Sequence, residues 1–248
     1  MNKTRAALTH LWPTVLLLLA IGCLIVFAWY PPPFLEFGDT AKFSLMLIVV
    51  AALIGPAMTA LVYKKGKSSL LFDLTVIIII QVVAVAWGTV ALYQNRPYFM
   101  VFTIDRFEVF SRRNIELNTI KDDRFLDKPL SGPIVLYANK PRDKQVYSNL
   151  VKEVMLEGKP DLQYRPEFWS IYSDRQMEVL SVAKPLNDLR IMRPASVSAI
   201  DNLVQKNGGN IDELSFVPGL HQNGEFAAIL DANSGEIVAG LMVDPWID

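Results

Sequence analysis

The chain has 248 residues, of which 52% are hydrophobic, and its formal net charge is −1. Six of the 24 basic and three of the 25 acidic residues precede Arg96, so the residues from there onward carry 18 basic and 22 acidic side chains. This acidic composition argues against nucleic acid as a partner. Cys23 is the single cysteine, which excludes a disulfide within these residues, and His10 and His221 fit no metal-ligand spacing. We therefore expect no metal and no cofactor.

Three apolar segments are long enough to cross a bilayer as helices, which takes about 20 residues each. They cover residues 11–30, 43–63 and 71–93, and each ends in aromatic residues suited to the membrane interface. The sequence predicts a membrane anchor over 1–95, followed by a soluble α+β domain over 96–248.

The first segment has two alternative interpretations. Lys3 and Arg5 precede an apolar core, as in a signal peptide, but the core is too long and no small-residue cleavage site follows. The stretch Ala20–Cys23 loosely resembles a lipobox, yet Ala stands where Leu is usual and the chain stays apolar beyond Cys23. We favour a retained membrane span.

Basic residues at the ends of the segments predict the orientation, because cytoplasmic loops are enriched in Lys and Arg. The N-terminal tail and the loop between the second and third segments hold Lys3, Arg5, Lys64, Lys65 and Lys67. The opposite side has Lys42 beside Glu36 and Asp39, and Arg96. We expect a cytoplasmic N-terminus and, in a Gram-negative cell, an inner-membrane protein with a periplasmic C-terminal domain.

Strands are predicted at both ends of the soluble domain, with helices between them. Residues 98–104 and 107–110 favour strands, and 226–231 and 236–243 favour a hairpin. Helices are predicted at 143–156, with Asp143 as N-cap and Gly158 as stop, at 166–180, and at 194–206.

No nucleophile elbow, phosphate loop or dinucleotide fingerprint occurs, so we expect no enzyme. The membrane segments are more informative. Gln81 is a polar group in mid-span that needs a partner, either in a neighbouring span or in another protein. Gly55-Pro56 predicts a kink or a notch for another helix, and Asp73 complements the positive N-terminus of its helix.

Several stretches resemble the TfpX/TfpZ family of type IV pilin accessory proteins, by order and spacing more than by any single motif. They are Trp29-Tyr30-Pro31, Leu53-Ile54-Gly55-Pro56, Phe72 to Ile77 with Gln81 and Gly88, Tyr93 to Pro97, Val101-Phe102, Asp105-Arg106-Phe107 and Asp244-Pro245-Trp246.

The resemblance implies an inner-membrane chaperone or accessory factor that binds the major type IV pilin and modulates its availability for pilus assembly. We expect contacts with both the membrane helix and the periplasmic head of pilin, within the lipid bilayer. The candidate partner-binding residues are Gly55, Pro56, Asp73, Gln81, Arg96 and Pro97. A hydrogen bond donated by Gln81 to a carboxylate in the pilin helix is one specific hypothesis.

Two other classes remain open. A membrane-tethered enzyme of the cell envelope would need a polar pocket with converging titratable groups. A ligand-binding sensor would need a partner for its output, because the predicted cytoplasmic parts are short.

Overall fold

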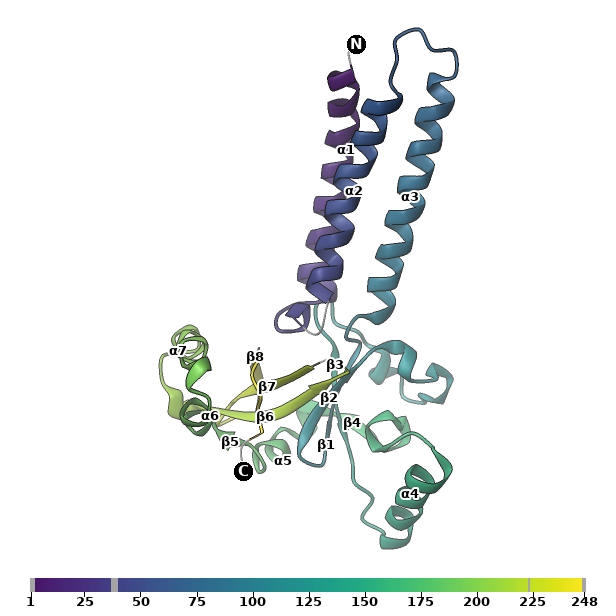
Figure 1. The fold of residues 1–248 in the computed structure, drawn as a ribbon. Coiled ribbons are helices and arrows are strands. Elements are labelled where there is room, and N and C mark those ends of the chain that lie inside the picture. The colour runs from purple at the N-terminus through teal and green to yellow at the C-terminus, as the bar shows by residue number, and fades with distance from the viewer. Residues whose placement is uncertain (1–2, 37–39, 223, 247–248) are drawn as a thin grey trace.

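A computed structural model describes residues 3–36, 40–222 and 224–246, so Asp39, one of the residues used to predict the orientation, lies outside the described residues. Its first part is a stalk of three long helices: α1 (Lys3–Leu24), continued by a π-helical turn at Ile25–Trp29, α2 (Thr40–Val62) and α3 (Leu70–Asn95). Figure 1 shows a domain with a central sheet at the end of the stalk that lies away from the N-terminus and the α2–α3 loop.

The outside of the stalk is apolar. Trp12, Leu61, Leu71 and Trp87 are between 69% and 81% exposed. Each stalk helix is long and apolar enough to cross a membrane, over Leu8–Trp29, Thr40–Val62 and Leu70–Asn95. So much exposed apolar surface suits lipid and not water. The helices predicted at 11–30, 43–63 and 71–93 are thus confirmed as helices within a few residues, and α2 continues unbroken through Pro56.

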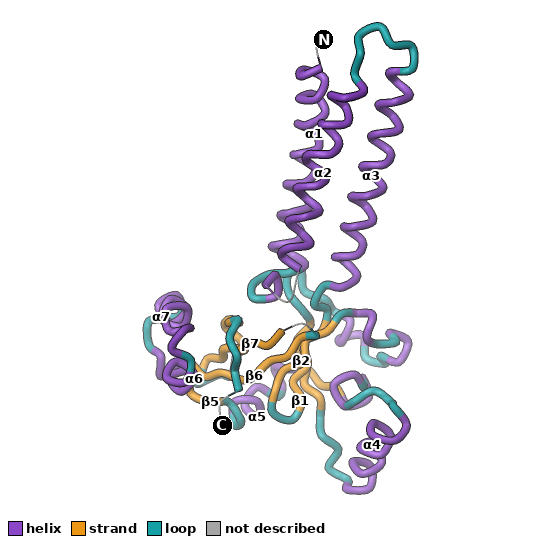
Figure 2. The backbone as a smooth tube through the Cα atoms, in the orientation of Figure 1, coloured by secondary structure: helices purple, strands orange, loops and turns teal. Residues whose placement is uncertain are grey.

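The domain is built on one mixed sheet with the strand order β4-β3-β1-β2-β6-β7-β8, and β5 pairs with β6 (Figure 2). The pairs β1–β3 and β2–β6 are parallel and the other pairs are antiparallel. The strands are β1 (Phe99–Thr103), β2 (Arg106–Phe110), β3 (Ile134–Ala138), β4 (Trp169–Ile171), β5 (Lys184–Pro185), β6 (Leu214–His221), β7 (Gly224–Asp231) and β8 (Ile237–Leu241).

Alternate residues along the strands point to opposite faces of the sheet, and both faces are covered. On one face, α4 (Lys144–Glu157) lies over the β4 end, while α6 (Leu186–Met192) and α7 (Val197–Lys206) cover the β8 end (Figure 1). The other face holds Met100, Phe102 and the residues around the short helix α5 (Gln176–Leu180). β1 is buried along its whole length, as expected of a central strand.

Most predicted elements of the domain are confirmed, including the β7–β8 hairpin and the helix capped by Asp143, whose carboxylate accepts hydrogen bonds from Gln145 N and Val146 N. The helix predicted at 166–180 is wrong. Trp169–Ile171 forms β4 instead, and only Gln176–Leu180 is α-helical. Pairing with β3 satisfies the backbone of this segment, and Trp169 is buried against Phe99.

The stalk and the domain share one hydrophobic core. Ile25, in the last turn of the first membrane-length stretch, and Tyr30 and Phe34, which follow it, are buried in the same cluster as Phe102 and Phe226 of the sheet. The hydroxyl of Tyr30 also donates a hydrogen bond to the carbonyl of Leu92 in α3 at 2.7 Å, and burial raises its pKa well above the usual range. The domain is therefore packed against the stalk and is not merely connected to it through the chain.

Gly240 of β8 allows the closest approach across this joint. A Cβ atom at position 240 would lie 2.4 Å from Cγ and 2.5 Å from Cδ of Pro33, and a proline ring has little freedom to move away. We expect Gly240→Ala to lower the free energy of unfolding by about 1–3 kcal/mol, as overpacking does. Unfolding of the full-length protein in detergent, followed by tryptophan fluorescence, measures this change.

Gly22→Ala is the matched control, because its Cβ would meet only Ile48 at an ordinary 3.6 Å. Equal stabilities for the two variants would show that Pro33 and β8 do not pack as described.

Candidate functional site

Gln81 lies in the middle of α3 and joins all three stalk helices. Its side-chain amide nitrogen donates a hydrogen bond of 2.9 Å to the carbonyl of Ala51 in α2 and one of 3.5 Å to the hydroxyl of Thr14 in α1. Closer to the N-terminal end, His10 Nδ1 and Thr59 Oγ1 share a hydrogen bond of 2.6 Å. In an apolar bundle such polar contacts each contribute on the order of 1 kcal/mol.

Gly55 leaves room for the side chain of Gln81, because glycine has no Cβ atom. A Cβ atom on Gly55 would stand 1.9 Å from Oε1 of Gln81, so any larger residue displaces the amide. The structure thus brings together two of the predicted partner-binding residues, with the buried Pro56 next to them on α2. Gly55 serves first to admit a side chain of the same chain.

This geometry argues against the hypothesis that Gln81 donates a hydrogen bond to a carboxylate in the pilin helix. Both hydrogens of its amide are engaged inside the bundle, so it has none left to donate to a carboxylate of another helix. Its Oε1 is buried and has no hydrogen-bond partner among the described residues. Oε1 lies against the backbone of Gly55 and is enclosed in the bundle, so a group of another helix reaches it only if the side chain of Gln81 moves.

A groove runs between α2 and α3 from Gln81 down to the domain, and it consists of two adjoining hollows. The upper hollow has a volume of about 270 Å³ and is lined by Gln81, Gly55 and apolar side chains. The lower one has about 1110 Å³, and Leu47 and Ala84 line both. From Gln81 to Asn95 the groove extends over about 21 Å at 1.5 Å per helical residue. That is roughly two thirds of the hydrocarbon thickness of a bilayer.

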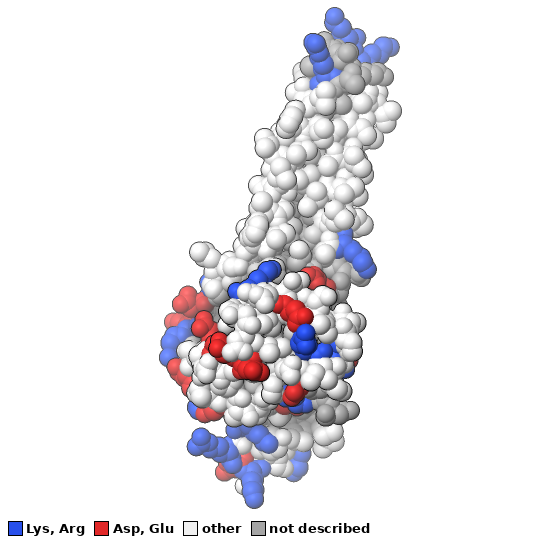
Figure 3. Space-filling model, turned by 90° about the vertical axis from the view of Figure 1, so that its left-hand side faces the viewer, with Lys and Arg blue, Asp and Glu red and all other residues white. Residues whose placement is uncertain are grey.

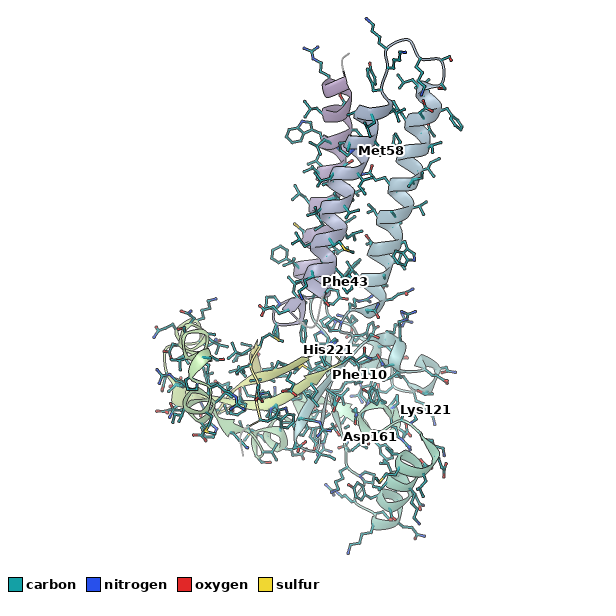
Figure 4. All side chains as sticks on the ribbon, in the orientation of Figure 1. Phe43, Met58, Phe110, Lys121, Asp161 and His221 are labelled. Atoms are coloured by element: carbon teal, nitrogen blue, oxygen red, sulfur yellow. The ribbon has the colours of Figure 1, made fainter. Side chains whose placement is uncertain are left out.

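Small residues on α3 keep the groove open. Ala84, Gly88 and Ala91 all line the lower hollow, and Leu47 of α2 lies against Gly88 where a Cβ would be 2.7 Å away. Small residues at such spacing permit the close approach of another helix in a membrane. In Figure 4, Met58 of the upper hollow and Phe43 of the lower hollow lie along α2, and His221 lies below them.

The foot of the groove is polar and belongs to both parts of the protein. Asn95 and Tyr30 come from the stalk side, and Ser111, His221 and Gln222 come from the domain. Burial lowers the pKa of His221 to about 4, so its imidazole is neutral at neutral pH. The hydroxyl of Ser111 donates to Asn114 Oδ1 at 2.9 Å and caps a short helix, so it is not poised as a nucleophile.

The other predicted residues lie at the two ends of α3. At the far end of the stalk, Asp73 forms an ion pair of 2.5 Å with Lys67 and accepts a hydrogen bond from Ser69, which holds the α2–α3 loop. At the domain end, Arg96 donates to the carbonyl of Tyr93 and Pro97 is buried. Neither end is close to Gln81, so the candidate residues form three separate places and not one site.

Sequence reasoning missed the groove itself. The signal was present for α3, where Ala84, Gly88 and Ala91 recur at helical spacing. No sequence signal marked His221, because this residue reaches the groove only where β6 ends beneath the stalk. Within the described ranges, no group of three or more His, Cys, Asp or Glu side chains is placed to hold a metal.

These features define a class: a domain with a mixed sheet, fused to three helices of membrane-spanning length that leave an apolar groove open. Curated relatives narrow the class. The chain is 25% identical over 245 residues to the fimbrial assembly protein of serogroup E1 of Dichelobacter nodosus, covering 94% of this chain and 95% of the relative. For the serogroup I protein of the same bacterium the identity is 27% over 216 residues, covering 85% and 83%.

A third relative, the fimbrial assembly protein of serogroups C1 and C2 of D. nodosus, is 30% identical over 99 residues, which are 39% of this chain and 76% of the relative. The chain belongs to the family of these fimbrial assembly proteins. No family model matches it. No solved structure matches it either.

The contact between Gly55 and Gln81 predicts strong coupling between the two positions. Gly55→Ala alone forces the amide of Gln81 out of its place and breaks its bonds to Ala51 and Thr14. We expect Gly55→Ala to destabilise the protein in the presence of Gln81 and to have almost no effect in a Gln81→Ala background. A double-mutant cycle on unfolding in detergent measures the coupling, expected at about 1–2 kcal/mol. Additive effects would contradict the contact.

The lowered pKa of His221 predicts a pH dependence of stability. Between pH 6.5 and about 4 the unfolded chain binds a proton at this position before the folded chain does. The free energy of unfolding therefore falls as the pH falls through this window. We expect His221→Gln to make the melting temperature less sensitive to acid between pH 7 and 4.5 than that of the unaltered protein. Parallel curves for the two proteins would show that His221 is not buried in its neutral form.

Proposed function

We propose that this protein is an accessory protein of the TfpX/TfpZ type, which binds the major type IV pilin in the bacterial inner membrane and modulates its availability for pilus assembly. Its membership of the fimbrial assembly family supports a role in pilus biogenesis. The groove between α2 and α3 is the observation that carries the more specific proposal of pilin binding.

The distribution of charge supports the proposed orientation. Arg5 and the α2–α3 loop with Lys64, Lys65 and Lys67 lie at the same end of the stalk. Figure 3 shows basic side chains at that tip, a long stretch of stalk below it without charged residues on the visible face, and charges of both signs on the domain. By the positive-inside rule the tip is cytoplasmic, which puts the domain in the periplasm.

The groove suits a single membrane helix. It is open toward the bilayer, its walls are apolar, and small residues on α3 let a partner backbone approach.

The foot of the groove suits a subunit that continues from a membrane helix into a periplasmic head. Asn95 ends the membrane-length helix, and Ser111 and Gln222 belong to the domain. A pilin seated in the groove therefore contacts both parts at once. Each contact raises the effective concentration for the other, so two weak contacts suffice for capture.

We propose further that the protein acts by binding and not by catalysis. His221 and Tyr30 are the titratable residues that line the lower hollow in the described part of the chain. Burial favours the neutral form of each, because it lowers the pKa of His221 and raises that of Tyr30. The hydroxyl of Ser111 is already engaged with Asn114.

Filling the groove tests the proposal. Ala84 lines both hollows, so Ala84→Trp is expected to block entry of a partner helix. Full-length tagged protein is purified from native membranes in mild detergent, and pilin in the eluate and pili per cell are both counted. We expect at least a tenfold loss of co-purified pilin and a clear change in pilus number.

Ala86→Trp is the matched control, because Ala86 is also exposed on α3 but lines neither hollow. Equal recovery of pilin with both variants would exclude the groove as the binding site. If unaltered protein recovers no pilin, and cells without it assemble normal pili, pilin binding itself is wrong.

A further inference from the structure

Three cationic side chains gather around the ring of Tyr98, where the chain leaves the stalk. The guanidinium carbon of Arg96 lies 3.5 Å from the ring centre of Tyr93 and 5.3 Å from that of Tyr98. The guanidinium carbon of Arg112 and Nζ of Lys128 each lie 5.9 Å from the centre of the Tyr98 ring. We call Arg96, Arg112 and Lys128 the basic cluster.

The lack of ion pairs in the described part of the chain sets the basic cluster apart from many other charged side chains. Within the described ranges none of its members forms an ion pair with a carboxylate, whereas ten other ion pairs are present. Lys128 Nζ donates to the carbonyls of Pro129 and Gly132, which leaves one of its three hydrogens free. Burial and the charge of Arg96 lower the pKa of Lys128 to about 8. A bound anion would relieve this repulsion.

The loop that carries Lys128 lies against the end of the first stalk helix. The hydroxyl of Ser131 donates a hydrogen bond of 2.6 Å to the carbonyl of Phe27, and Gly132 lies beside Pro31. Phe27 belongs to the membrane-length stretch Leu8–Trp29 and is 71% exposed. The loop is therefore at the depth where the membrane-length helix ends.

Leu130 at the tip of this loop is 97% exposed. A leucine held out at the end of a membrane helix has acyl chains as its natural surroundings, and the cations next to it are at the level of the headgroups. Trp29 and Tyr93, whose ring centres are 5.1 Å apart, mark the same interface.

We propose that Arg96, Arg112 and Lys128 bind the phosphate of an anionic phospholipid, with Leu130 inserted among its acyl chains. The combination of an unpaired basic cluster with an exposed leucine favours a lipid over a free phosphate ion, since free phosphate gains nothing from Leu130. Such a lipid lies between the stalk and the domain and fixes the tilt of the domain on the membrane. The site is separate from the groove and does not depend on pilin binding.

Lipid retention by the full-length protein tests the proposal. Protein purified in detergent is incubated with equal amounts of phosphatidylglycerol and phosphatidylcholine, and the lipids that stay bound are counted by native mass spectrometry. We expect a preference for phosphatidylglycerol that falls by about fivefold for each cation removed. The variants are Arg112→Gln alone and the triple change Arg96→Gln, Lys128→Gln and Arg112→Gln.

The matched control removes the same number of charges elsewhere on the domain, by Arg113→Gln, Lys121→Gln and Lys152→Gln. Melting temperatures of all variants verify that they are folded. Because Arg112 is exposed, the single variant Arg112→Gln is expected to fold and keeps the test informative even if the triple variant is unstable. If the control loses as much preference as the triple variant, the binding is unspecific attraction to charge and the proposed site is wrong. No preference in the unaltered protein also overturns it.

A second comparison distinguishes lipid from free phosphate. Leu130→Ser is expected to weaken retention of phosphatidylglycerol severalfold, and 10 mM inorganic phosphate is expected to displace little of it. If phosphate displaces the lipid completely and Leu130→Ser has no effect, the basic cluster is a site for free anions and not for a lipid.

Discussion

The hydrophobic core that stalk and domain share is the contact on which the rest of the structure depends. Ile25, Tyr30 and Phe34 are buried against sheet residues such as Phe226, with the rings of Phe34 and Phe226 6.3 Å apart. Burying one large apolar side chain contributes about 1.5–3 kcal/mol, so three of them hold the sheet firmly against the end of α1. Because of this contact, the foot of the groove has a fixed geometry although it combines residues from both parts, and the basic cluster of the domain is held next to the end of the stalk.

The stalk, by contrast, has very little core of its own. Leu18, Ala51 and Val85 are its buried cluster in the described residues, and most other apolar side chains point outward. In lipid there is no hydrophobic gain from bringing helices together, so the bundle relies on close packing and hydrogen bonds. Gln81 supplies these bonds between α3 and the other two helices, while α2 and α3 stay apart on one side. The bundle is therefore incomplete on the side of the groove.

The sequence was sufficient for features that depend on local chemistry. The three stalk helices, the Asp143 cap and the final hairpin follow from periodicity and turn residues, which local sequence controls. It failed at Trp169–Ile171, where pairing with β3 overrides a helical pattern of apolar residues. It also did not find β3 and β6, which are placed by contacts with strands far away in the chain. Gly55 and Gln81 were singled out separately, but only the structure shows that one makes room for the other.

The way α3 is held has a mechanical consequence. Its first turn is fixed to the loop by the Lys67–Asp73 ion pair, and its last turns are fixed to Tyr30 through the carbonyl of Leu92. Between these ends Gln81 provides its hydrogen-bonded attachment to the other stalk helices. Helix α3 is thus held at both ends and at one point in between. Bending of α3 between these points would change the width of the groove more than it changes the position of the domain.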